Sequence, residues 1–239
     1  MSEESPLGPI TVYWAPATDP QHGQWNLMYP EPQNLYEEYQ SNPEGFESLS
    51  DVEEPLNTFV FRHPHEASYK FDFIKPQEPV VQPLTSRYVS HQGIPKESPR
   101  DTAKIGFALR YIFFAEEPLV AFFRPPAKHP EKHMKTGKVL PESYDIGKSF
   151  REFQLVMELK NTQGILTFDK DEPMFYLELG TKRDVIFKRF EFSEKLAGYR
   201  SHYETFFPRD TKQADRDNQF MDTRTNELVL NEIKKNLLD

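Results

Sequence analysis

Alternating apolar and polar residues predict β-strands along most of the chain. In the clearest case Tyr69, Phe71 and Phe73 alternate with Lys70 and Asp72, which is typical of a strand with one buried and one solvent-facing side. Other aromatic or β-branched runs are bounded by prolines and turn residues, as strands and corners are. The predicted strands are Ile10–Trp14, Trp25–Tyr29, Leu56–Arg62, Ser68–Ile74, Tyr88–Ser90, Phe107–Ala115, Leu119–Arg124, Phe150–Leu159, Ile165–Phe168, Met174–Leu179 and Val185–Phe192.

The connections between these strands predict an antiparallel fold. Asp169–Pro173 carries turn-forming carboxylates and a proline, and it joins two predicted strands as an antiparallel turn would. Helical periodicity is nearly absent before residue 193, so the crossover helices of a parallel sheet are missing. We therefore predict a mainly β fold, an antiparallel β-sandwich or jelly-roll-like domain over residues 1–192.

The C-terminal part, residues 193–239, changes to a helical pattern. Ser193 is placed as an N-cap, and Glu194 follows in the first turn, where an acid suits the helix dipole; this predicts a helix through about Phe206. A second helix is predicted to begin near Thr225.

The second predicted helix carries one apolar stripe, because Leu230, Ile233 and Leu237 fall at i, i+3 and i+7. Such a stripe buries against another surface, either the sandwich of the same chain or a partner. We expect the helical C-terminal extension to pack on its own sandwich. Residues 31–55, rich in Glu, Pro, Ser, Asn and Gln, are predicted to form a long solvated loop and an interaction segment.

Composition narrows the classes of partner and compartment. The 239 residues include 38 Asp and Glu against 29 Lys and Arg, which gives a formal net charge of −9 and a pI near 5.4. An acidic chain repels nucleic-acid phosphates and anionic lipid headgroups, so neither is an expected partner. No cysteine occurs, which excludes disulfides, thiolate metal sites and cysteine nucleophiles.

The compartment follows from the absence of targeting patterns. The N-terminus has no cationic and apolar regions of a secretory signal. The most apolar stretch, Tyr111–Phe123, is interrupted by two glutamates and a proline and is too short to span a bilayer. We therefore predict an intracellular protein without a membrane segment.

Two histidine pairs raise the question of a metal site. His63 and His65 are separated by Pro64, and the carboxylate and glycine spacing that follows the HxH of cupin-type metalloproteins is missing here. His129 and His133 have the i, i+4 spacing of helical zinc ligands, but lysines surround them. We predict no metal ligand, and imidazoles on exposed loops instead.

Two groups of residues are candidates for binding. The first is the only local concentration of positive charge, which either forms a solvated basic turn or holds an anionic ligand or acidic partner patch; it consists of Arg124, Lys128, His129, Lys132, His133, Lys135 and Lys138. The second is aromatic: Trp14, Trp25 and Tyr29 lie near proline-bearing loops, where they either line a groove for a ligand or peptide or anchor the core at strand ends.

Catalytic signatures are missing from the sequence. No nucleophile elbow, paired catalytic carboxylates or ordered Ser, His and Asp stand out, and the ten glycines form neither a GxGxxG nor a Walker loop. We predict no catalytic residue and no cofactor.

Several aromatic strand patterns resemble uncharacterised proteins encoded by tailed bacteriophages, including marine T4-like phages. The similar stretches are Ile10–Pro16, Trp25–Pro30, Phe150–Phe153, Phe168–Tyr176 and Lys188–Phe190. The resemblance implies a phage-encoded protein of unknown activity, found in the cytoplasm of an infected cell or in the virion, and it carries over no catalytic residue.

The functional hypothesis is a non-enzymatic protein-binding or assembly protein that meets a protein partner or a second copy of itself through loops at one end of the sandwich and its tail helix. One alternative is a cupin-like metal-dependent enzyme or small-ligand-binding protein. A further alternative is a structural virion component.

Overall fold

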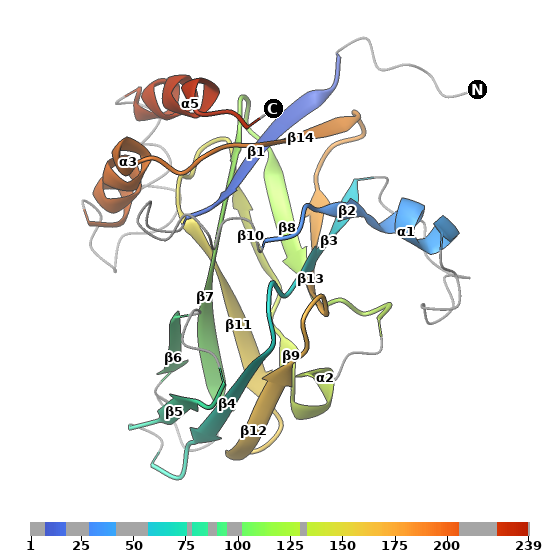
Figure 1. The fold of residues 1–239 in the computed structure, drawn as a ribbon, viewed down its shortest axis with the longest axis vertical. Coiled ribbons are helices and arrows are strands. Elements are labelled where there is room, and N and C mark those ends of the chain that lie inside the picture. The colour runs from blue at the N-terminus through green and yellow to red at the C-terminus, as the bar shows by residue number, and fades with distance from the viewer. Residues whose placement is uncertain are drawn as a thin grey trace.

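Three packed β-sheets form the body of the fold, and two C-terminal helices cover one of them (Figure 1). The computed structural model describes residues 8–17, 29–41, 57–75, 78–85, 90–94, 102–129, 133–205 and 224–238. The mainly β, sandwich-like class predicted from the sequence is confirmed, with helices in the C-terminal part.

The largest sheet, called here the six-stranded sheet, has the order β14–β1–β7–β11–β9, and β6 pairs with the N-terminal part of β7. Its strands are β1 Ile10–Pro16, β6 Ser90–Ile94, β7 Lys104–Ala115, β9 Gly137–Val139, β11 Glu152–Leu159 and β14 Val185–Arg189. β1 and β14 run parallel, whereas the other neighbours are antiparallel. The sheet therefore contains one parallel pair in an otherwise antiparallel arrangement.

Two smaller sheets face the six-stranded sheet. The five-stranded sheet has the order β10–β8–β13–β3–β2, and the three-stranded sheet has the order β12–β4–β5. Their strands are β2 Gln33–Asn34, β3 Thr58–Arg62, β4 Ala67–Asp72, β5 Val80–Pro83, β8 Val120–Arg124, β10 Glu142–Asp145, β12 Gln163–Phe168 and β13 Pro173–Leu179. All their strand pairs are antiparallel.

A single two-stranded ribbon joins the two smaller sheets. β3 runs into β4 and β12 runs into β13, and the pairs β3–β13 and β4–β12 are each antiparallel. The ribbon bends where residues 63–66 lie beside residues 169–172, and its two halves belong to different sheets. This bend is called the ribbon corner below.

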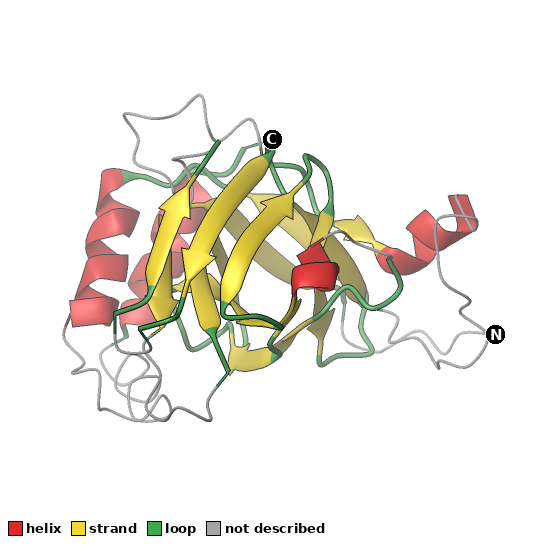
Figure 2. Cartoon of the chain, turned by 90° about the horizontal axis from the view of Figure 1, so that it is seen from below, coloured by secondary structure: helices red, strands yellow, loops and turns green. Residues whose placement is uncertain are grey.

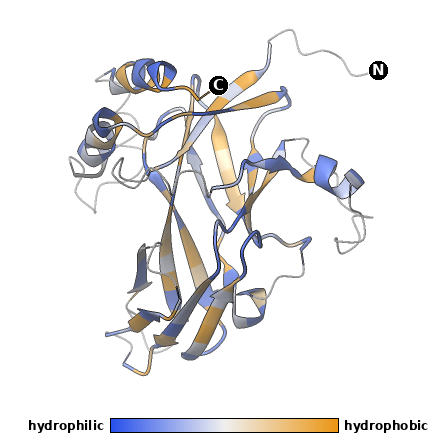
Figure 3. Cartoon of the chain, in the orientation of Figure 1, coloured by the Kyte–Doolittle hydropathy of each residue, from blue (hydrophilic) through white to orange (hydrophobic). Residues whose placement is uncertain are grey.

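Aromatic side chains fill the space between the sheets. The rings of Phe61 and Phe175 are nearly parallel with centroids 5.0 Å apart, and those of Phe123 and Phe153 are 4.0 Å apart. Phe107 extends the same core beneath the three-stranded sheet, 5.1 Å from Tyr69. Because aromatic rings bury much apolar area each, this core accounts for the high Phe and Tyr content. Figure 3 shows hydrophobic residues recurring along the central strands, whereas α1 (Leu35–Ser41) is mostly hydrophilic.

The C-terminal helices α3 (Glu194–Thr205) and α5 (Thr225–Lys235) pack on the outer face of the six-stranded sheet. In Figure 2 they flank the strands on the side opposite α1. The predicted N-cap is confirmed, because the Ser193 Oγ accepts the Leu196 N–H at 3.3 Å. Ile233 of the predicted apolar stripe is fully buried, and Leu230 and Leu237 are partly buried against the same cluster. The described helices α3 and α5 therefore pack on the six-stranded sheet of the same chain.

Several predictions are corrected by the structure or fall outside the described residues. Of the loop predicted at residues 31–55, residues 33–41 form β2 and α1 instead, and residues 42–55 are outside the described part. The predicted strand Trp25–Tyr29 is described only at Tyr29, which lies in a bend. Strands β5, β9 and β10 and the short helix α2 (His133–Thr136) are not anticipated by the sequence patterns.

Candidate functional site

The aromatic candidates lie in the core. Trp14 is 1% exposed and Tyr29 is 7% exposed, and both rings contact Tyr111, with centroids 6.1 and 5.0 Å away. The guanidinium of Arg189 stands 4.9 Å from the Trp14 ring centroid. This geometry matches the core-anchor alternative. Trp25 lies outside the described residues, so ligand binding by these aromatic residues stays a prediction.

The basic candidates are separated into exposed and buried groups. Arg124 is exposed and pairs with Glu178 at 2.8 Å, and Lys138 pairs with Glu158 at 3.6 Å. Lys128 is partly exposed, and Lys132 lies outside the described residues. Two of these cations thus already have carboxylate partners, and an anion-binding role stays a prediction.

His129 and His133 are buried, which corrects the expectation of imidazoles on an exposed basic turn. The Nδ1 of His129 is hydrogen-bonded to the Tyr176 hydroxyl at 2.6 Å, and its Nε2 lies 3.4 Å from Glu38 Oε1. Glu38 also forms an ion pair with Arg62. Burial raises the pKa of Glu38, but the hydrogen bonds and charges of His129 and Arg62 outweigh it, so that the pKa lies below its ordinary value.

His133 begins α2 and is bound to Glu172 of the β12–β13 turn. Its Nδ1–H donates to Glu172 Oε1 at 2.9 Å, and its backbone N–H donates to the same oxygen at 3.3 Å. The other carboxylate oxygen of Glu172 accepts the Asp169 N–H at 2.7 Å. Burial raises the pKa of Glu172, but these hydrogen bonds stabilise the carboxylate and lower the pKa overall.

His63 is buried at the ribbon corner and is 1% exposed, which corrects the expectation that it lies on an exposed loop. Its ring stacks on Phe168 with centroids 5.0 Å apart, and its Nδ1 lies within hydrogen-bonding distance of both the carbonyl oxygen and the N–H of His65. Its backbone N–H donates to the Glu172 carbonyl at 2.9 Å. Burial first, and the nearby His65 second, lower the pKa of His63 to about 3.

His133 of the second histidine motif therefore meets the first motif at the ribbon corner, whereas His129 contacts Tyr176 and Glu38 instead. We call His63, His65, His133 and Glu172 the histidine corner. Across the described residues no group of three or more His, Asp or Glu side chains is arranged to bind a metal ion. The described residues therefore offer no metal-binding group that would support the cupin-like alternative.

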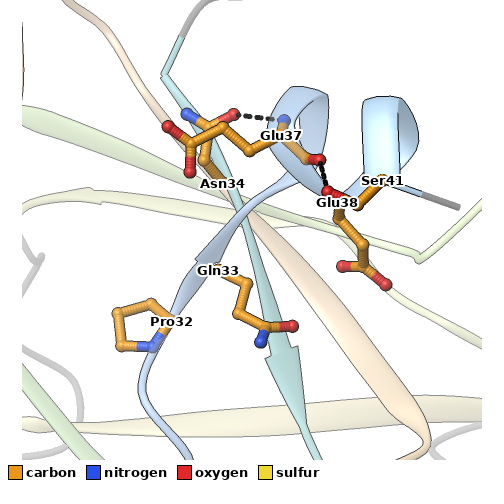
Figure 4. Close-up of a pocket in the computed structure, with 6 residues that line it drawn as sticks. All are labelled: Pro32, Gln33, Asn34, Glu37, Glu38 and Ser41. Atoms are coloured by element: carbon orange, nitrogen blue, oxygen red, sulfur yellow. Dashed lines mark hydrogen bonds between the residues drawn. The ribbon is translucent and has the colours of Figure 1, made fainter.

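An open depression of about 370 Å³ lies beside β2 and α1 (Figure 4). Its lining residues are Pro32, Gln33, Asn34, Glu37, Glu38 and Ser41. Local hydrogen bonds engage much of this polar lining: Asn34 Oδ1 accepts the Glu37 N–H at 3.3 Å, and Ser41 Oγ donates to the Glu37 carbonyl at 2.9 Å. The depression is thus part of the cap and first turns of α1.

The outer face of the three-stranded sheet carries an unusual share of exposed aliphatic residues. Among the described residues nine large hydrophobic side chains are exposed, and four of them, Ile74, Val80, Leu84 and Ile165, lie on or beside these three strands. The strand register places Ile165 beside Lys70, and Val80 beside Asp72, on the same side of the sheet. The opposite side, with Tyr69 and Phe71, is buried in the core.

This face was missed as a site by sequence reasoning, although part of the signal was present. The alternation around Lys70 predicts the solvent-facing side of β4. That Ile165 lies on the same side is shown only by the pairing of its strand with β4. Val80 belongs to β5, a four-residue strand between prolines that shows no usable alternation.

Comparison with known proteins gives no family. No protein-family model matches the chain, and no curated protein is significantly similar to it. None of the described helices combines the length and the apolar character needed to cross a bilayer.

Proposed function

We propose that the protein is a non-enzymatic assembly protein that associates with a second copy of itself through the outer face of the three-stranded sheet. The observation that carries this proposal is the gathering of four exposed aliphatic residues at the three-stranded sheet, with Val80 and Ile165 on its outer face, Ile74 and Leu84 just after β4 and β5, and exposed fractions between 48% and 66%. Grouped exposed aliphatic residues on a soluble protein are typical of interaction surfaces.

The charges of this face favour a second copy as the partner. Two chains with a net charge of −9 each repel one another over most orientations. The outer face, however, is neutral, because Lys70 stands beside Asp72 along β4, and Lys75 pairs with Glu78 at 3.4 Å in the β4–β5 connection. Repulsion between copies is therefore weakest here.

The order of charges along β4 also suits a two-fold axis. When such an axis crosses β4 between Lys70 and Asp72, each lysine lies opposite Asp72 of the partner subunit, and the contact occurs twice. Three short strands provide a small interface, so we expect a weak dimer with a Kd in the micromolar range. We also propose, from the sequence resemblance, that this assembly takes place in a tailed-phage context, inside the infected cell or in the virion.

A pair of isoleucine substitutions tests the proposal. Ile165→Lys puts a charge into the proposed interface beside Lys70, and it should raise the dimer Kd about tenfold or more, which corresponds to about 1.4 kcal/mol. Ile186→Lys on β14 is the matched control, because Ile186 is also an exposed strand isoleucine, at 44% against 56% for Ile165. Sedimentation velocity over a range of concentrations measures both.

Purified wild-type protein that stays monomeric at every concentration would overturn the proposal. So would a dimer that both lysine variants weaken equally, because the interface would then lie elsewhere. Thermal unfolding of the two variants checks that each remains folded.

A further inference from the structure

The ribbon corner consists of the two chain crossings that connect the five-stranded and three-stranded sheets within the described residues. β3 passes into β4 through residues 63–66, and β12 passes into β13 through residues 169–172. Two backbone hydrogen bonds link these crossings, His63 N–H to the Glu172 carbonyl and Asp171 N–H to the His63 carbonyl, each at 2.9 Å. The corner therefore sets the bend between the two smaller sheets, while the aromatic core beneath β4 and β12 holds the three-stranded sheet against the six-stranded sheet.

Helix α2 adds the third part of this corner. It contacts β9 of the six-stranded sheet and β12 of the three-stranded sheet. It therefore covers one side of the core between these two sheets. His133 fixes α2 to the corner through two hydrogen bonds to Glu172. Its Nε2 is buried without a hydrogen-bond partner.

Three titratable groups lie close to the His63 ring, and β12 contributes the uncharged Phe168 on which it stacks. His65 belongs to the same loop, His133 to α2, and Glu172 to the β12–β13 turn. The neighbouring Arg62 donates to the Asp171 carbonyl at 2.8 Å and pairs with Glu38. A proton on His63 therefore meets two further imidazoles and one carboxylate, and Glu172 already accepts from His133.

We propose that the histidine corner is an acid-sensitive hinge, in which protonation of His63 separates the 63–66 loop from the 169–172 turn and α2, while the aromatic core keeps the three-stranded sheet in place. The buried ring, stacked on Phe168 and bonded through Nδ1 to a backbone carbonyl, has no carboxylate within hydrogen-bonding distance to receive the new charge. Opening exposes the imidazolium to water, where it is stable.

The direction of the pH effect follows from linkage. His63 has an ordinary pKa of 6.5 when exposed and a pKa of about 3 in the closed corner. Below pH 6.5 the open form therefore binds the proton and the closed form does not, and the open population rises about tenfold for each pH unit. Glu172, whose pKa is also lowered, adds to the same direction below its ordinary 4.5. Both groups thus favour the closed corner near neutrality.

Hydrogen exchange followed by mass spectrometry tests the hinge on the full chain. Protection factors, corrected for the intrinsic rate at each pH, are compared at pH ~7 and pH ~5.5. We expect protection to fall about tenfold in residues 63–66, 133–136 and 169–172, while β4, β12 and the central strands β7 and β11 keep theirs. Dilute samples keep the protein monomeric, so the result is independent of self-association.

Substitutions identify the group that titrates. His63→Phe keeps an aromatic ring against Phe168 and cannot take up a proton, so the corner should lose most of its pH dependence. His202→Gln, at an exposed histidine of α3, is the control and should keep the wild-type response.

Two results would overturn the hinge. One is wild-type protection that falls equally in the ribbon corner and in β7 and β11, which would mean global acid unfolding. The other is protection of the corner that does not change with pH. Both come from the wild-type protein alone, so the test holds even when His63→Phe fails to fold.

Discussion

Replacing Gly147 with alanine is expected to destabilise the protein by about 3 kcal/mol or more. Gly147 follows β10 in a buried turn, and an added Cβ would lie 2.1 Å from the carbonyl oxygen of Glu117 and 2.9 Å from the Cα of Pro118. These are backbone atoms, so no rotamer change relieves the clash. Movement of the turn would also disturb Asp145, whose Oδ1 accepts the Gly147 N–H and the Leu119 N–H, each at 2.9 Å.

Thermal unfolding measures this effect, with Gly198→Ala as the control. Gly198 lies inside α3 with open space around the added Cβ, and alanine is the better helix former, so this variant should gain about 0.5–1 kcal/mol. For a chain of this size 1 kcal/mol shifts the Tm by about 2–4 °C. A Gly147→Ala variant that melts at the wild-type Tm would show that the close approach to Glu117 does not exist.

The substitution Val229→Asp is expected to lower the free energy of unfolding by about 3–5 kcal/mol. Val229 is fully buried between α5 and the six-stranded sheet, in the cluster that includes Tyr13, Phe114 and Phe150. The carboxylate of an aspartate at this position has neither a counter-charge nor water around it. In an apolar environment the free-energy cost of such an unpaired, desolvated charge is large. The C-terminal helices should then detach or the whole fold should fail.

The neighbouring residue provides the control for that prediction. Leu228 precedes Val229 on the same helix and is 52% exposed, so Leu228→Asp should change stability by about 0.5 kcal/mol or less. Chemical denaturation of both variants gives the comparison. Equal losses in the two variants would contradict the described packing of α5.

The sequence predicts those strands whose pattern is set locally. β4 and β11 bury alternate side chains along most of their length, and their period-two pattern is visible without any partner. β5, β9 and β10 have three or four residues each, too few for a period to emerge, and prolines or glycine flank them. The parallel pairing of β1 with β14 joins strands from opposite ends of the chain, which no local pattern specifies.

Burial of the histidines is the clearest failure of sequence reasoning, and its cause is long-range packing. His63 and Glu172 are 109 positions apart, and α2 brings His133 from a third segment. A histidine next to proline or lysine has the local composition of a surface turn. The local sequence therefore predicts exposed imidazoles, whereas the structure buries His63, His129 and His133. The HxH and HxxxH motifs contain three of the four residues of the corner, His63, His65 and His133, but they identify neither Glu172 nor the burial of His63 and His133.

Self-association through the three-stranded sheet is the central functional claim, and a single introduced cysteine tests it most directly. The chain has no cysteine of its own, so every disulfide formed must join the introduced residues. Gln82 is exposed on the outer face beside Lys70, whereas Lys188 is exposed on β14, away from the proposed interface. Under mild oxidation, Gln82→Cys should form a covalent dimer much faster than Lys188→Cys at the same concentration. Equal rates for the two variants, or a faster reaction of Lys188→Cys, would contradict the account.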